Sequence, residues 1–139
     1  AIIDNGFDTE HIEIKDKIIY TYNAITGSSD VSQTGDEHHG TSVAGIIAGT
    51  DDNIGTRGVA PDVSLILIKM PERLSDSSVI EMFNKAVEAG ADIINCSWGT
   101  GNVSDSVKSA IRNLGKTARN GKGVLIVFAS GNGNKPMGN

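Results

Sequence analysis

Short apolar runs alternate with segments of helical spacing along almost the entire chain. The runs are apolar nearly throughout, which is typical of strands buried on both faces of a parallel sheet. The segments between them place apolar residues three and four positions apart, which predicts helices. We expect strands at residues 1–4, 18–22, 63–70, 91–96 and 124–129, and helices at 39–49, 77–89 and 103–118.

This order of elements predicts an α/β fold with a doubly wound, mainly parallel β-sheet and helices on both faces. A length of 139 residues fits one domain. Ligands of such sheets bind at the carboxyl ends of the strands. The polar residues at those ends, Asp4, Ser97 and residues 130–132, are therefore the first candidates for a functional site.

Composition excludes several classes of function. The net charge is -5 and no basic run occurs, so nucleic acids and anionic membranes are poor partners. No apolar stretch approaches the roughly 18 residues that a membrane span needs. Cys96 is the single cysteine, so no internal disulfide can form.

Asp4 at the end of a strand and His39 at the start of a helix form a candidate catalytic pair. A buried carboxylate is costly unless it has a hydrogen-bond partner. The positive end of a helix disfavours an imidazolium and so favours a neutral His that can accept a proton. An Asp that orients such a His is the base half of a Ser-His-Asp triad. A turn-capping Asp and an ordinary N-terminal helix His would give the same spacing.

The sequence around both residues resembles the subtilase family of serine proteases. Residues 2–8 (IIDNGFD) are similar to the family's Asp motif, and residues 39–49 (HGTSVAGIIAG) are similar to its His motif. Residues 55–61 (GTRGVAP), 95–99 (NCSWG) and 129–133 (ASGNG) resemble later segments of the family in the same order. The resemblance covers nearly the whole chain and implies a subtilisin-like serine endopeptidase.

The resemblance also implies roles for individual residues. Asp4 would be the orienting acid, His39 the general base and Asn132 the amide donor of the oxyanion hole. His38 competes with His39, but His39 directly precedes Gly-Thr-Ser, so His38 is interpreted as a solvated loop residue. Asn132 lies in Gly-Asn-Gly, a pattern that also forms turns for backbone reasons alone.

The family's nucleophile motif, Gly-Thr-Ser followed by small residues and a Pro, is missing. Residues 40–42 are Gly-Thr-Ser, but they follow His39 directly and have no Pro after them, so Ser42 is expected to be a helix residue. The resemblance places the catalytic Ser beyond residue 139. Residues 1–139 are therefore expected to be a partial peptidase domain, cut at both ends, incomplete at the C-terminus and inactive alone.

Ser97, Trp98 and Gly99 resemble the strand that lines the family's substrate cleft. An extended peptide can pair with exposed backbone there, although Trp98 could equally be a packing aromatic. The triplet favours the kexin-like branch, which cuts after basic residues. Asn5 stands where that branch has a second acid, and the loop after Gly99 lacks its acidic cluster. Asp36 could still face a basic side chain.

A structural Ca²⁺ site is a further implication of the resemblance. Subtilases often bind Ca²⁺ in the loop before Gly-Val-Ala-Pro, here residues 51–56, with help from an acid after the Asp motif. The matching acids are Glu13 and Asp52, whose hard oxygen ligands suit Ca²⁺. A polar surface turn would have the same composition. No cofactor is expected for catalysis.

The expected partners are a peptide or protein substrate and a propeptide or the C-terminal remainder of the domain. A secreted or cell-envelope location is favoured by the resemblance alone. A subtilase-like pseudoenzyme, which binds peptides without cleaving them, is one alternative. A nucleotide- or phosphate-binding α/β module is another, because glycine clusters at 99–101 and 131–133 follow strands, but neither cluster matches a phosphate-binding motif.

Overall fold

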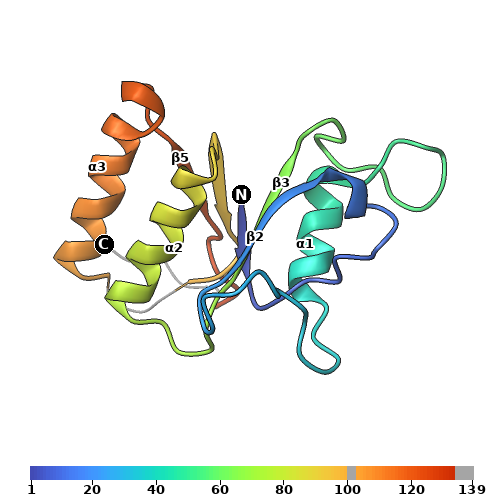
Figure 1. The fold of residues 1–139 in the computed structure, drawn as a ribbon, viewed down its shortest axis with the longest axis horizontal. Helices are drawn as coiled ribbons and strands as arrows, with labels where there is room; N and C mark the ends of the chain where they lie inside the picture. The colour runs from blue at the N-terminus through green and yellow to red at the C-terminus, as the bar shows by residue number, and fades with distance from the viewer. Residues whose placement is uncertain (100–102, 134–139) are drawn as a thin grey trace.

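A computed structural model describes residues 1–99 and 103–133, which form a parallel sheet with helices on both faces (Figure 1). The five strands pair in parallel in the order β2-β3-β1-β4-β5. The expected α/β fold with a doubly wound parallel sheet is therefore confirmed. The elements are β1 (Ile2–Asp4), η1 (Lys15–Lys17), β2 (Ile18–Asn23), α1 (His39–Ala48), β3 (Leu65–Lys69), α2 (Asp76–Glu88), β4 (Ile93–Cys96), α3 (Asp105–Gly121) and β5 (Leu125–Phe128).

The inner strands fill two separate cores because neighbouring residues of a strand point to opposite faces of the sheet. Ile2 and Leu67 are buried on the face that α1 covers. Ile3 and Ile68 are buried on the opposite face, which α2 and α3 cover. Figure 1 shows α1 on one side of the sheet and the other two helices together on the other side. The continuous apolar runs of the sequence are thereby explained.

The helices begin in two different ways. α2 has a serine N-cap, Ser75, whose hydroxyl accepts a hydrogen bond from the Ser78 backbone N. α3 likewise begins after Ser104, whose hydroxyl accepts from the Val107 backbone N at 3.2 Å. α1 follows His38, whose side chain caps no backbone N–H of the helix. No helix within residues 1–99 and 103–133 is long and apolar enough to cross a membrane.

The outer strand β5 departs from the expectation that every strand is buried on both faces. Leu125 is 60% exposed and Val127 is 44% exposed, and Ile93 of the neighbouring β4 is 51% exposed. The register pairs Ile93 with Leu125, so their side chains lie on the same face of the sheet. α1 packs over β1 and β3 on that face and leaves these three residues uncovered.

Candidate active site

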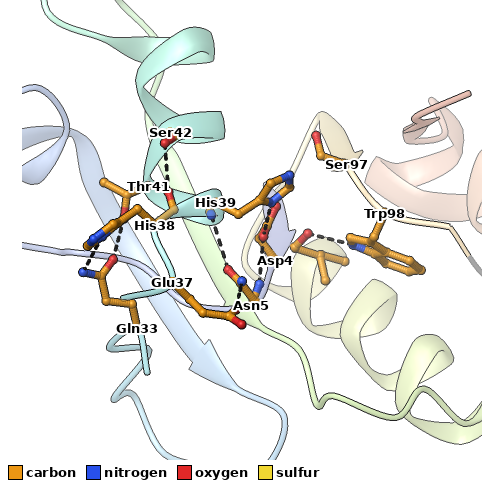
Figure 2. A network of polar contacts seen from close by, with 12 residues as sticks. Asp4, Asn5, Gln33, Glu37, His38, His39, Thr41, Ser42, Ser97 and Trp98 are labelled. Carbon is orange, nitrogen blue, oxygen red and sulfur yellow. Dashed lines mark hydrogen bonds and ion pairs between the residues drawn. The ribbon is translucent and has the colours of Figure 1, made fainter. Parts of the chain in front are cut away.

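Asp4 lies at the carboxyl end of the central strand β1 and is buried, with 1% of the residue exposed. Its Oδ1 accepts two hydrogen bonds, from the Asn5 backbone N at 2.8 Å and from His39 Nδ1 at 2.7 Å (Figure 2). In the described part of the chain, no donor reaches Oδ2. The carboxylate is therefore held on one oxygen by a neighbour in sequence and by the first residue of α1.

His39 is half-exposed although its partner is buried: 55% of its side chain is accessible to solvent. A carboxylate only accepts hydrogen bonds, so the contact with Asp4 puts a proton on His39 Nδ1. In the neutral ring Nε2 then carries no proton and can accept one from a hydroxyl group placed next to it. The arrangement is a base whose tautomer and orientation are fixed by a buried acid.

The helix can begin this close to β1 because Gly40 has no side chain. A methyl group at this position would collide with the Gly6 carbonyl oxygen. It would also lie 3.0 Å from Asp4 Cβ and 3.1 Å from Cε1 of Phe7, which is itself buried. Gly40 therefore sets how closely α1 approaches the strand, and with it the distance between Asp4 and His39.

His38 points away from Asp4 and toward Gln33, as Figure 2 shows. Its exposed ring lies with Nδ1 at 3.0 Å from Gln33 Nε2. The Ser42 hydroxyl donates to the His38 carbonyl oxygen at 2.9 Å, so Ser42 is a helix residue, as expected. This side of α1 borders an open cavity of about 500 Å³, to which Asp4 and His39 do not contribute.

Trp98, beyond the end of β4, packs against the strand that carries the acid. Its indole N–H donates to the Ile3 carbonyl oxygen at 2.8 Å, and its ring meets Phe128 edge to face with centroids 5.7 Å apart. Packing is therefore one role of this aromatic. Ser97 is partly buried and Gly99 is exposed. The loop that follows, predicted to lack an acidic cluster, includes residues 100–102, which lie outside the described residues.

Comparison with known families decides what kind of protein this is. The Peptidase S8 profile, which represents the subtilase family, matches residues 1–139. The chain belongs to the subtilase family. The expected family is thereby confirmed, whereas the roles of individual residues stay predictions.

Several named proteins and solved structures match almost the whole of this chain. It is 32% identical to "Calcium-dependent protease" of Nostoc sp., over 100% of this chain and 24% of the relative. It is 37% identical to "Major intracellular serine protease" of Bacillus subtilis, over 95% of this chain and 42% of the relative. A cold adapted subtilisin-like serine proteinase matches with a TM-score of 0.70 and 27% identity, over 96% of this chain and 46% of that chain. MycP1 with the N-terminal propeptide removed matches with a TM-score of 0.71 and 28% identity, over 96% of this chain and 42% of that chain. The chain thus spans less than half the length of each.

The loop that follows α1 lies against a buried carboxylate. Glu13 is 8% exposed, and its Oε2 accepts from the Thr50 backbone N at 2.9 Å. A methyl group on Gly55 would collide with Glu13 Oε1, so the loop lies directly against this carboxylate. Asp52 is exposed, and its Oδ1 accepts from the Ile54 backbone N at 2.9 Å. Among the residues described, no three His, Cys, Asp or Glu side chains gather as a metal site, so a cation here would also need main-chain carbonyls.

Asn132 and Asp36 are both exposed and both lie in loops. Asn132 follows β5, and Asp36 precedes α1 by three residues. Because all strands are parallel, Asn132 and residues 97–99 lie at the same edge of the sheet as Asp4. The structure therefore brings the strand-end candidates to one edge, and it joins Asp4 to His39 by a hydrogen bond.

Sequence reasoning missed the side chain of Asn5. Its Oδ1 accepts from the Gly40 backbone N at 3.3 Å, and its Nδ2 donates to the Glu37 carboxylate (Figure 2). Two signals in the sequence pointed to it. The predicted helix begins after His38, which is a poor cap residue, and a good cap residue, Asn, stands beside the strand-end acid.

Proposed function

We propose that this chain is part of a serine endopeptidase that hydrolyses peptide bonds through an Asp-His-Ser triad. The proposal is carried by the 2.7 Å hydrogen bond between the buried Asp4 Oδ1 and the half-exposed His39 Nδ1. Membership of the subtilase family and the similarity to two named proteases support it. Asp4 is the orienting acid and His39 is the general base.

Each half of the proposed reaction moves one proton through His39. Nε2 accepts the proton of a serine hydroxyl while the serine oxygen bonds to the substrate carbonyl carbon, and the former carbonyl oxygen becomes negatively charged. Asp4 stays ionised and stabilises the imidazolium through Nδ1–H. His39 then gives the proton to the leaving nitrogen as the C–N bond breaks and the carbonyl re-forms in an acyl-serine. In the second half a water molecule gives a proton to His39 Nε2 and its oxygen bonds to the acyl carbon, and His39 returns that proton to the serine oxygen as the ester bond breaks and the carboxylic acid leaves. Burial of Asp4 keeps water from competing for Nδ1–H.

Asn132 is the proposed donor to the developing oxyanion. Its exposed side chain follows β5 at the sheet edge where Asp4 ends β1. An amide N–H aimed at this charge stabilises the transition state more than the ground state. Such a donor is worth about 10²–10³ in rate, a magnitude that was established on a subtilisin.

The nucleophile is proposed to come from a part of the domain that follows these residues. Ser42 does not serve, because its hydroxyl donates to the His38 carbonyl within α1. The span of 24% and 42% of the two protease relatives supports a partial domain over residues 1–139. On this proposal the 139-residue chain alone does not hydrolyse peptides.

The proposed substrate is an extended peptide that pairs with the backbone at Ser97, Trp98 and Gly99. Gly99 is exposed and has no side chain, so a substrate backbone can approach closely. Asp36, exposed near the start of α1, is the proposed acid for a basic side chain. A peptide-library profile of the complete protein and of Asp36→Asn tests this. A wild-type profile without an Arg or Lys preference rules the basic specificity out.

A fluorophosphonate probe tests the catalytic proposal in the complete protein. We expect covalent labelling of a single Ser beyond residue 139, located by peptide mass spectrometry. His39→Ala should abolish labelling, whereas His38→Ala should retain it, because His38 contacts Gln33 and not Asp4. A folded, mature protein that is not labelled would contradict the proposal and point to a pseudoenzyme that binds peptides without cleaving them.

We also propose that Glu13 and Asp52 hold a Ca²⁺ ion. The buried Glu13 carboxylate, enclosed by the loop at Gly55, fits a hard cation that prefers oxygen ligands. The named calcium-dependent relative supports the choice of metal. The ion would hold the loop closed by neutralising the buried charge. We expect chelation to lower the melting temperature of the wild type and to leave Glu13→Gln little changed, with Asp62→Asn, an exposed acid elsewhere, behaving as wild type. An unchanged wild-type melting temperature on chelation would remove the proposal.

A propeptide is a further proposed partner. One similar solved structure, MycP1, had its N-terminal propeptide removed, which supports a propeptide in this protein as well. The expected secreted or cell-envelope location stays a prediction that rests on the resemblance. One named relative, from Bacillus subtilis, is an intracellular protease.

A further inference from the structure

The start of α1 lacks a capping side chain of its own. The first N–H groups of a helix have no partner inside the helix and need acceptors from elsewhere. His38 stands at the N-cap and supplies none. The Asn5 side-chain oxygen, which comes from the segment after β1, instead accepts from the Gly40 backbone N at 3.3 Å. The helix that carries His39 is thus capped from another part of the chain.

The other end of the same amide holds the turn before the helix. Asn5 Nδ2 donates to the Glu37 carboxylate. The orientation of the amide is determined, because a backbone N–H can only donate and a carboxylate can only accept. The Asn5 side chain therefore contacts the backbone after His39, at Gly40, and the side chain of Glu37 before it.

The backbone of Asn5 is bonded to the acid of the same pair. Its N–H donates to Asp4 Oδ1 at 2.8 Å, the oxygen that also accepts from His39 Nδ1. Asn5 therefore contacts Asp4 through its main chain and both flanks of His39 through its side chain. This residue does not have a positive φ, so the turn itself does not demand an Asn.

We propose that Asn5, braced by Glu37, is a positioning residue that holds His39 against Asp4. The inference rests on the proposed peptidase function for its effect on rate, but the geometry can be tested without it. Removal of the amide frees residues 37–40 from the strand end. Misplacement of a catalytic group by about 1 Å can cost on the order of 100-fold in rate.

The donor and acceptor pattern suggests a set of four variants of the complete protein. Asn5→Ala removes both side-chain hydrogen bonds. Asn5→Asp keeps an acceptor for the Gly40 N–H but sets two carboxylates against each other at Glu37. Glu37→Gln still accepts from Asn5 through its amide oxygen. Asn5→Asp combined with Glu37→Gln restores the bridge with donor and acceptor exchanged. Asn84→Ala, an exposed helix residue, is the control.

Two readouts are measured on each variant: kcat and KM on a peptide substrate, and the low-field Nδ1 proton signal of His39 in protein labelled with ¹⁵N-histidine. We expect Asn5→Ala and Asn5→Asp to lower kcat about 10- to 100-fold with KM nearly unchanged, and to broaden or shift the Nδ1 signal. Glu37→Gln and Asn84→Ala should behave as wild type. The double variant should recover much of what Asn5→Asp loses.

Either of two results would overturn the proposal. One is an Asn5→Ala protein with the wild-type kcat and the wild-type Nδ1 signal, which would leave Asn5 as a turn residue. The other is a double variant no better than Asn5→Asp. If Asn5→Ala does not fold, the comparison of the double variant with Asn5→Asp tests the proposal instead. If the wild type lacks peptidase activity, the proposed function fails, but the Nδ1 signal still tests the position of His39.

Discussion

Both hydrogen bonds to the Asp4 carboxylate fall on the same oxygen. Oδ1 accepts from His39 and from the Asn5 backbone, while Oδ2 is buried and has no donor among the described residues. A buried charged oxygen without a donor is unfavourable for stability. On the proposed function, Asp4 therefore orients the imidazole at a cost in the stability of the fold.

Asp4→Asn separates these two effects. Because both hydrogen bonds fall on Oδ1, the amide of Asn places either its oxygen or its nitrogen there. With the oxygen there, both hydrogen bonds are kept, but the negative charge that stabilises the imidazolium is lost. With the nitrogen there, the bond from the Asn5 N–H is lost and the amide donates to His39 Nδ1, which forces the ring into the tautomer with a proton on Nε2 that cannot act as a base. We expect kcat of the complete protein to fall about 10⁴-fold, with a melting temperature equal to or above that of wild type. A loss of activity below tenfold, or a large drop in melting temperature, would contradict this account.

Cys96 makes stability depend on pH in the alkaline range. Its side chain is fully buried, and burial raises the pKa of the thiol from 9.0 to about 12. The folded state therefore prefers the neutral thiol, so its contribution is complete below pH 9 and is lost as pH rises toward 12. Relative to Cys96→Ala, the free energy of unfolding of wild type should fall above pH 9 by up to about 1.4 kcal/mol per pH unit. Urea titrations of both proteins from pH 7 to alkaline pH measure the difference, and parallel curves would show that the thiol is not buried.

Single residues differ in how far the sequence predicts them. Asp4 and His39 could be found because each stands in a long motif, and the hydrogen bond between them follows from the fold. The hydrogen-bond partners of Asn5 could not be predicted, because Gly40 and Glu37 are more than thirty residues away in sequence. Their approach to Asn5 depends on how α1 packs against β1. Trp98 was open between packing and substrate contact, and the structure shows the packing.

At the scale of elements, two glycines of helix α1 differ in their surroundings. Glycine inside a helix costs about 1 kcal/mol relative to Ala, so the small residues in HGTSVAGIIAG predict close packing of this helix against its neighbours. That prediction is confirmed for Gly40, which is buried against Gly6 and Asp4. It is wrong for Gly45, which is partly exposed and has no atom within 4 Å of the place where a Cβ would stand.

Alanine at the two positions should therefore change stability in opposite directions. Gly40→Ala overpacks the contact with the Gly6 carbonyl and should lower the free energy of unfolding by about 1–3 kcal/mol. Gly45→Ala meets open space and gains helix propensity, so it should raise that free energy by about 0.5–1 kcal/mol. Chemical denaturation of both variants measures this. Equal effects of the same sign would contradict the packing seen at Gly40.

The boundaries of the elements were predictable where local signals exist. Helices were expected at 77–89 and 103–118, and they begin one or two residues away, at Asp76 and Asp105, directly after serine N-caps. The exposed β5 was not predictable, because its apolar run is the same whether one face or both faces are covered. Coverage depends on which helices lie above the strand, which is a property of the whole sheet.

For the whole molecule, the two faces of the sheet are covered unequally. α2 and α3 bury their face from β3 to β4, whereas α1 covers only the part of the other face formed by β1 and β3. Ile93 of β4 and Leu125 and Val127 of β5 are left as an apolar patch, and β5 is the outer strand of the described sheet. Exposed apolar surface next to an unpaired strand edge favours association with another chain.

The patch predicts the behaviour of the 139-residue chain in solution. We expect the chain to bind the dye ANS and to self-associate at micromolar concentration, because burial of the patch removes apolar surface from water. Leu125→Thr with Val127→Thr should reduce dye fluorescence and shift the chain toward monomer in sedimentation velocity. Ile19→Thr, which changes an exposed apolar residue on the opposite outer strand β2, should leave both measurements nearly unchanged. If the β2 variant reduces association and the β5 variant does not, the opposite edge of the sheet is the contact surface and the uncovered face of β5 is not.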